Sequence, residues 1–117
     1  DGWRASWPWG CEGCRVTATT QTAERAYRSA GGVAGVEVRH DLGPGAHLDW
    51  LPQETILFEG SALTRRTVVS LGEGASCLVL EAVALGRAAM GEVVRTVAFR
   101  DRRSVLRNGI PVLVEPL

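Results

Sequence analysis

The chain contains no lysine: all thirteen of its basic residues are arginine, and thirteen acidic residues balance them. A protein without a basic excess has little electrostatic attraction for nucleic acid or for an anionic membrane surface. Long hydrophobic runs are also missing, because the longest one, CLVLEAVALG, is interrupted by Glu81 and is too short to cross a bilayer. These absences predict a protein that uses neither nucleic acid nor a membrane as partner.

Cysteine is scarce and odd in number, with three residues in the chain. An odd count fits a reducing compartment better than a disulfide scaffold, so we expect a cytoplasmic protein. Cys11 and Cys14 have the C-x-x-C spacing of half a zinc site, but a structural zinc site needs four ligands. No second pair exists, and the remaining candidates are Cys77, His40 and His47. Incidental cysteines are the favoured interpretation.

The length of 117 residues and a hydrophobic content of 45% suit one globular domain. Residues 1–14 hold three of the four tryptophans without regular periodicity, so we expect an irregular stretch there and a β domain over residues 15–117. The chain starts at Asp1 and stops in a strand-like run, which predicts a piece of a longer protein. Such a piece would expose strand edges and is expected to dimerise or aggregate.

A weak internal repeat organises the middle of the chain. LGPGAHLDW starts at Leu42 and LGEGASCLV starts at Leu71, 29 residues later, with a looser third copy at Gly13. Gly-x-Gly supplies the positive-φ backbone of a tight turn, and VEVRHDL and TRRTVVSL before the turns are strand-like. Each copy therefore predicts strand, turn and strand.

Later segments continue this pattern. Asn108-Gly109 between two apolar runs predicts a hairpin, with Pro111 suited to an edge position. TQTAERAYRS and LEAVALGRAAM are ambiguous between strand and helix. The predicted fold is mainly β, built from stacked strands with short glycine turns and one or two short helices.

Catalytic patterns are weak. His47 and Asp49 share one strand face, opposite Leu48 and Trp50, and we expect that face to be solvated. No nucleophile elbow supports a serine–histidine–aspartate triad, and neither G-x-G turn continues as a phosphate loop. Two arginine clusters, Arg65-Arg66 and 100–103, are more readily explained by a solvated face than by a protein interface. The protein is therefore not expected to be an enzyme, and a small hydrolase or metal enzyme is the weaker alternative.

Polar residues inside apolar runs are the unusual feature. WLPQETILFEG places Gln53 and Glu54 in a strand-like run, Glu81 lies near the corresponding level of the next copy, and Gln21 lies near that of the loose third copy. A buried carboxylate is costly unless it is paired, and Arg65 or Arg87 is a candidate partner. The alternatives are a buried arginine–carboxylate network or the wall of a wet internal passage.

Three blocks in one order, TTQTAERAYRS, WLPQETILFEGSALTRR and LEAVALGRAAMGE, resemble the urease accessory protein UreD family, called UreH in some bacteria. The resemblance runs from about Arg15 to the C-terminus and covers the central part of a longer family. It implies strands stacked into a two-layered, helically wound β arrangement. It also implies a non-enzymatic scaffold that binds urease apoprotein and UreF, and UreG through UreF, while nickel passes in transit with no tightly bound cofactor.

Weakly binding oxygen ligands suit such a nickel path better than thiolates. Under this resemblance Glu54 and Glu81 are the candidate nickel-path residues, and Gln21, Gln53 and Arg87 are tunnel or packing candidates. The competing expectation is a non-functional truncated remnant of such a protein.

Overall fold

The computed structural model describes residues 2–9, 13–20, 24–26, 34–86 and 97–116. Within these ranges the chain forms strands and turns, and no residue is helical. The strands are β1 (Gly2–Trp9), β2 (Arg15–Ala18), β3 (Glu24–Ala26), β4 (Ala34–Leu42), β5 (His47–Trp50), β6 (Thr55–Leu57), β7 (Ala62–Leu71), β8 (Ser76–Val79), β9 (Val83–Leu85), β10 (Ala98–Arg107) and β11 (Ile110–Pro116). The mainly β prediction is confirmed. The two segments predicted to be ambiguous contain the short strands β3 and β9, with irregular residues beside them. The one or two short helices expected with the β fold are absent from the described residues.

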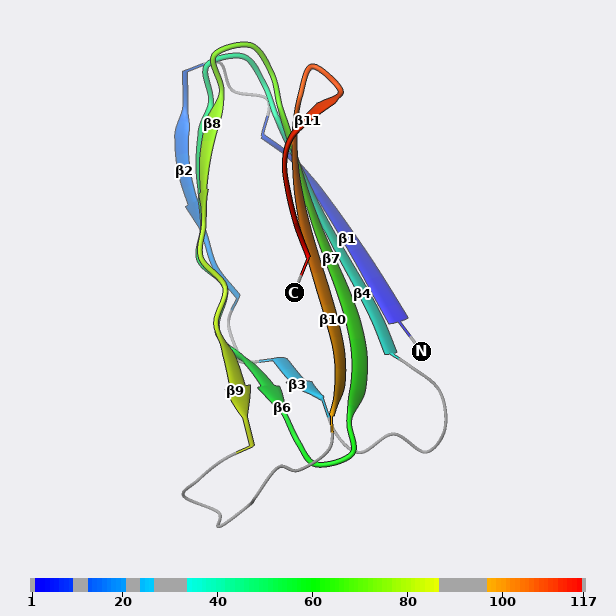
Figure 1. The fold of residues 1–117 in the computed structure, drawn as a ribbon. Coiled ribbons are helices and arrows are strands. Elements are labelled where there is room, and N and C mark those ends of the chain that lie inside the picture. Colours follow the sequence, from blue (N-terminus) through cyan, green and yellow to red (C-terminus); the bar gives the residue numbers. More distant parts are fainter. Residues whose placement is uncertain (1, 10–12, 21–23, 27–33, 87–96, 117) are drawn as a thin grey trace.

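The strands wind in coils that stack on one another (Figure 1). The long strands form one layer in the order β1-β4-β7-β10-β11, and the facing layer consists of two three-stranded sheets, β2-β5-β8 and β3-β6-β9. Every neighbouring pair is parallel except β10 with β11. The chain passes from a long strand through a turn into the facing layer and returns one coil further along, which gives the expected two-layered, helically wound arrangement.

The predicted repeat is the repeat of these coils. Leu42 pairs with Leu71, and His47 bonds Ser76 at a separation of 29 residues. The third copy is also confirmed, because Gly13, Gly45 and Gly74 have φ values of 71°, 70° and 71°. Their turns stack: the Gly13 N–H donates to the Pro44 carbonyl at 3.4 Å, and the Gly45 N–H donates to the Glu73 carbonyl at 2.8 Å.

The predicted hairpin joins β10 to β11. Asn108 and Gly109 both have positive φ, 51° and 77°, which is the backbone of a tight hairpin turn. β11 is the last strand of its sheet, and Pro111 therefore lies on an edge strand as expected.

The first strand changes the expectation for residues 1–14. Residues Gly2–Trp9 pair with β4 in parallel register, so the described part of this stretch is regular β structure and not irregular. Its burial alternates: Trp7 and Trp9 are half-buried, whereas Arg4, Ser6 and Pro8 are exposed. The two tryptophans pack against the core, which explains why this segment has a place in the sheet.

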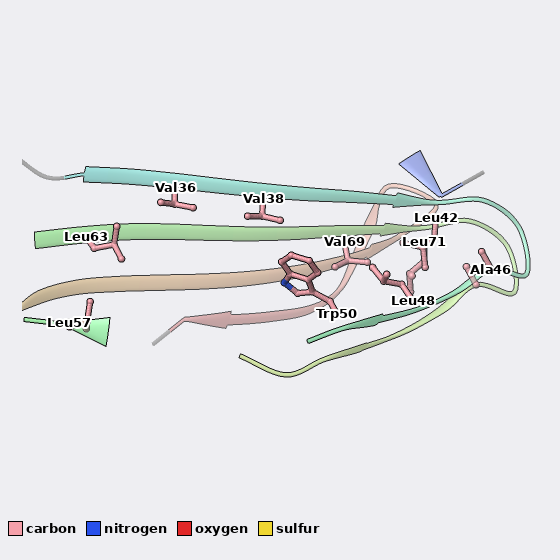
Figure 2. Packing of buried hydrophobic residues seen from close by; sticks show 11 residues of the cluster. Val36, Val38, Leu42, Ala46, Leu48, Trp50, Leu57, Leu63, Val69 and Leu71 are labelled. Carbon is pink, nitrogen blue, oxygen red and sulfur yellow. The ribbon is translucent and has the colours of Figure 1, made fainter. Parts of the chain in front are cut away.

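The core lies between the two layers (Figure 2). Alternation along each strand turns every second side chain inward. Val36 and Val38 of β4, Val69 and Leu71 of β7, and Leu48 of β5 are buried, as Figure 2 shows. Leu48, Val69 and Leu71 fill the end of the interior beside the stacked glycine turns. Further along, Arg65 of β7 and Asp101 of β10 place charges at inward positions, with Val36 paired beside Arg65 and buried Leu63 nearer the start of β7.

Candidate functional site

A cluster of four charged side chains occupies the interior between the layers. Arg65 of β7 and Asp101 of β10 stand at paired positions, and Arg65 donates to Asp101 through Nε at 3.1 Å and Nη2 at 2.8 Å. Glu81, from the β8–β9 connection, accepts from Arg103 Nε at 2.8 Å and lies 3.8 Å from Arg65 Nε. Arg103 Nη2 also reaches Asp101 at 3.1 Å. We call these four residues the charged network.

Neutral groups complete the charged network. The Arg65 guanidinium donates to Thr55 Oγ1 at 2.6 Å and lies over the Phe99 ring at 5.5 Å from its centroid. Thr67 Oγ1 lies 3.4 Å from a Glu81 oxygen. Multiple hydrogen bonds to each charged group reduce the penalty of taking charges out of water.

The network is largely buried and electrically balanced, and Arg103 is its most exposed member with 18% of its side chain accessible. The side chains of Asp101, Glu81 and Arg65 are only 0%, 3% and 5% exposed. Two arginines and two carboxylates give a sum of zero charge. Burial opposes the charge on Arg65, but the Asp101 hydrogen bonds and the negative charge of Glu81 outweigh it and raise the pKa of Arg65. The guanidinium therefore stays charged throughout the physiological range.

A cavity of about 340 Å³ adjoins this network. It lies between β8 on one layer and β10 and β11 on the other, with Glu81 and Arg103 on its polar side and Val79, Leu80 and Leu113 on its apolar side. Cys77, a free thiol, also lines it, and burial raises the pKa of this thiol. The cavity thus offers mostly neutral walls and one balanced charge pair.

The structure places the predicted site residues at different locations. Glu81 is part of the charged network, as the alternative of a buried arginine–carboxylate network supposed. Gln53 is exposed, and its backbone N–H donates to Thr20 Oγ1 at 2.9 Å. Glu54 is half-buried and forms no ion pair within the described ranges. Gln21 and Arg87 lie outside the described residues.

The correspondence between the polar positions of successive coils, Gln53 and Glu54 in one and Glu81 in the next, is loose, as expected. Trp50 pairs with Val79, an offset of 29, and Thr55 pairs with Val83, an offset of 28. The one-residue change falls in the connection that contains Gln53 and Glu54 in one coil and Glu81 in the next.

The solvated-face interpretation of the arginine clusters is wrong for half of their members. Arg65, Asp101 and Arg103 point into the interior, whereas Arg66 and Arg102 point outward and are exposed. Arg65 is also not the partner of Glu54. Strict alternation would have found the inward set, because Leu63, Arg65 and Thr67 share one strand face with Val69. Arg65 and Asp101 are separated by 36 residues, so the 29-residue repeat did not align them.

A second polar group lies on the outer face of β2-β5-β8. Asp49 accepts from Thr17 Oγ1 at 3.3 Å and bonds His47 Nε2 at 2.7 Å, while His47 Nδ1 and Ser76 Oγ are 2.6 Å apart. The hydrogen bond to His47 is the largest cause that lowers the pKa of Asp49. The shared face of His47 and Asp49 is confirmed, and Thr17 and Ser76 on it are exposed as expected, whereas Asp49 is largely buried.

This outer row contains the residue types of a catalytic triad without the surroundings of one. Ser76 lies in an exposed strand position, and its backbone N–H is engaged with the Ala46 carbonyl at 2.9 Å. Acyl transfer needs donors aimed at a developing oxyanion in a site that excludes water. We interpret the row as a hydrogen-bonded ladder across three coils.

Metal ligands do not converge in the part of the chain that the structure describes: no three histidine, cysteine or acidic side chains are grouped for a metal ion. Cys14 is disulfide-bonded, so its thiolate is not available as a ligand, and the expectation of reduced cysteines is wrong for this residue. Over the same residues, no helix is long and apolar enough to cross a membrane.

The sequence of this chain is similar to those of known proteins. The family model of the UreD urease accessory protein matches residues 11–117. A urease accessory protein UreD of Cereibacter sphaeroides strain ATCC 17023 is 67% identical over 106 residues, which are 91% of this chain and 38% of the relative. Those of Dinoroseobacter shibae and Rhizobium etli are 54% and 50% identical, each over 90% of this chain and over 37% and 38% of the relative.

The chain thus spans little more than a third of the length of these relatives. The matched region begins after β1 and includes every other described strand, together with the charged network and the stacked glycine turns. With the family model covering almost all of its residues, the chain belongs to the UreD urease accessory protein family.

Proposed function

We propose that this chain is part of a non-catalytic scaffold for urease maturation, which assembles with urease apoprotein and UreF, and with UreG through UreF, in the cytoplasm. The observation that carries this proposal is the family match over residues 11–117. Nickel is the cargo of such an assembly, held in transit and not as a resident cofactor. The rigid two-layered winding supports a scaffold role, because parallel strands in stacked coils fix the spacing of surface positions.

The two candidate carboxylates of the nickel path, Glu54 and Glu81, differ in their ion pairs. Glu81 is already neutralised by Arg103 and Arg65, so a cation gains attraction from it only if an arginine is displaced. Glu54 is half-buried and has no ion pair within the described ranges. An unpaired carboxylate is the better weak oxygen ligand for an ion that must be released. We therefore assign path lining to Glu54 and a structural role to Glu81.

The experiment is urease activation in cells that carry the full-length protein with Glu54→Gln or Glu81→Gln. Glu54→Gln is expected to lower the nickel content of urease at unchanged soluble protein and unchanged co-purification with UreF. Glu81→Gln is expected to lower the soluble amount as well, because the buried network then holds two arginines and only one carboxylate. Exposed Glu73, in a turn, supplies the control variant Glu73→Gln.

Normal nickel content with both variants would exclude the lining role for either residue. Loss of UreF from the purified complex with Glu54→Gln would instead place that residue in assembly. If the wild-type protein neither co-purifies with UreF nor supports activation, the scaffold proposal itself is wrong, and the expectation of a non-functional remnant stands in its place.

A further inference from the structure

One titratable ring lies inside the apolar half of the interior. His40 of β4 is 0% exposed. Its ring stacks on Trp7 with centroids 5.2 Å apart and planes at 18°, and lies 4.5 Å from the Trp50 ring at 57°. Trp9 Nε1 donates to His40 Nδ1 at 3.1 Å. Three tryptophans from β1 and β5 therefore enclose this histidine.

The hydrogen bond fixes the protonation state of the ring. Because Nδ1 accepts from Trp9, the proton of the neutral ring resides on Nε2. Nε2 is buried and has no hydrogen-bond partner among the described residues. Burial lowers the pKa of His40 to about 4, and the nearby charge of Asp41 opposes this shift only in part. At neutral pH the enclosed ring is uncharged.

The groups that face His40 from the neighbouring strands are uncharged. They are Trp7 and Trp9 on β1, Val69 at the paired position of β7, and Trp50 on β5. No neighbouring strand therefore offers an anion that would stabilise a protonated ring.

The charged side chains of the same strands are directed elsewhere. Arg39 and Asp41 flank His40 on β4, alternation directs them to the opposite face, and they pair with each other at 3.5 Å. Asp49 lies on the face of β5 opposite to Trp50 and bonds His47. On β1, Arg4 is exposed and pairs with Glu37 at 3.2 Å.

Of the strands that enclose His40, β1 is held by the fewest strand pairs. It is the first strand of its sheet and, among the described strands, pairs with β4 alone. It also precedes the region matched by the family model. Trp50, by contrast, belongs to the central strand of its sheet. β1 can leave without breaking any other pair of described strands, whereas removal of β5 would separate β2 from β8.

We propose that the protonation state of His40 controls the pairing of β1 with β4. Protonation at Nδ1 breaks the Trp9 hydrogen bond and releases β1 from β4 at acid pH, while β4, β7 and β10 stay assembled. A proton on Nδ1 opposes the Trp9 N–H donor, and the buried cation has no counterion inside. Departure of Trp7 and Trp9 admits water to the ring and relieves both penalties.

The direction of the pH effect follows from the two protonation equilibria. The ring has a pKa of about 4 when enclosed and an ordinary value of 6.5 when exposed. Docking of β1 is therefore fully supported above pH 6.5 and loses support as pH falls toward 4. A difference of 2.5 between these values corresponds to a docking equilibrium about 300-fold less favourable at acid pH.

The test is ¹⁹F NMR of the 117-residue chain labelled with 5-fluorotryptophan, with amide hydrogen exchange of β7 measured in parallel. Signals of Trp7 and Trp9, assigned with Trp7→Phe and Trp9→Phe, are expected to move to solvent-exposed shifts at a midpoint between pH 4 and 6.5. The β7 amides are expected to remain protected through this step. Loss of β7 protection at the same midpoint, or no release by pH 4, would overturn the proposal.

His40→Asn is the matched variant, because its amide oxygen replaces the Nδ1 acceptor and does not titrate in this range. β1 of His40→Asn is expected to stay docked at pH 4.5, and release over the wild-type pH range would contradict the mechanism. If this variant does not fold, Trp9→Phe serves instead. It removes the donor to Nδ1, so β1 is expected to dock more weakly at neutral pH. An unchanged pH dependence of β1 release would contradict the proposed role of His40.

Discussion

The interior has an apolar half and a charged half, and different interactions stabilise them. Beside the stacked glycine turns, Leu48, Val69 and Leu71 fill the space with apolar side chains. Nearer the start of β7, the same inward row carries Arg65, and Asp101 faces it from β10. The apolar half gains stability from area removed from water, whereas the charged half offsets desolvation by pairing. One continuous two-layered winding therefore holds a region stabilised by close apolar packing and a region in which each charged side chain depends on its partners.

Breaking the charged half is expected to give the largest effect. Arg65→Met removes three hydrogen bonds, to Thr55 and to both oxygens of Asp101, and leaves Asp101 buried beside Arg103 alone. Loss of one member of a buried ion pair costs about 3–5 kcal/mol. Urea unfolding of Arg65→Met and of Arg66→Met, its exposed neighbour on β7, measures the difference. Equal midpoints for the two variants would show that the network contributes nothing to stability.

In the apolar half, Leu48→Ala is expected to cost about 2–5 kcal/mol, because Leu48 is 0% exposed and its removal leaves a cavity among packed side chains. Leu85→Ala is the control, since Leu85 is 61% exposed and loses little on truncation. The free energy of unfolding of both variants is measured in urea. A cost for Leu48→Ala no larger than that for Leu85→Ala would mean that the apolar half is loosely packed.

At the turns that close the apolar half, Gly72→Ala is expected to cost about 1–3 kcal/mol, as overpacked substitutions do. A Cβ at Gly72 would lie 2.9 Å from the Leu42 carbonyl oxygen and 3.0 Å from the Pro44 nitrogen, both backbone atoms that cannot rotate away. Gly35→Ala meets nothing within 4 Å and is the matched control. Thermal unfolding of the pair distinguishes a clash between coils from a general effect of replacing glycine.

Substitution in the outer row of Thr17, Asp49, His47 and Ser76 is expected to change stability least, although this row also contains charged and hydrogen-bonding side chains. The lowered pKa of Asp49 means that its contribution to stability is present above the unfolded value of 3.8 and is lost as pH falls through the lower folded value. Asp49→Asn is therefore expected to change the midpoint of unfolding little at pH 7 compared with Arg65→Met, and to flatten the pH dependence below 4. A loss at pH 7 as large as that of Arg65→Met would show that the outer ladder matters as much as the buried network.

Much of the scaffold follows from local signals in the sequence. The repeated L-G-x-G-A predicts the stacked turns because only a residue without a side chain adopts their backbone at no cost. Asn108-Gly109 predicts the hairpin because asparagine and glycine both adopt positive φ, and the Val, Thr and Leu content of TRRTVVSL predicts β7. β1 was missed because its tryptophans look irregular until the register with β4 places Trp7 beside His40.

The candidate site could be predicted from the sequence only in part. Glu81 was noticed as a charge in an apolar run, but its partners Arg103 and Arg65 lie in other strands. The pairing of Arg65 with Asp101 crosses 36 residues, a spacing set by the longer connection between β9 and β10. Spacing in the sequence does not report the length of a coil when an insertion changes it.

The sequence by itself determined the strand-and-turn repeat, the charge balance and the family, since these depend on residue type and local periodicity. Only the tertiary structure decided which charges are buried together and which tryptophans enclose His40. The physical reason is that alternation assigns a side chain to a face, but register between coils selects its partner. A buried charge is stable only when that partner is in place.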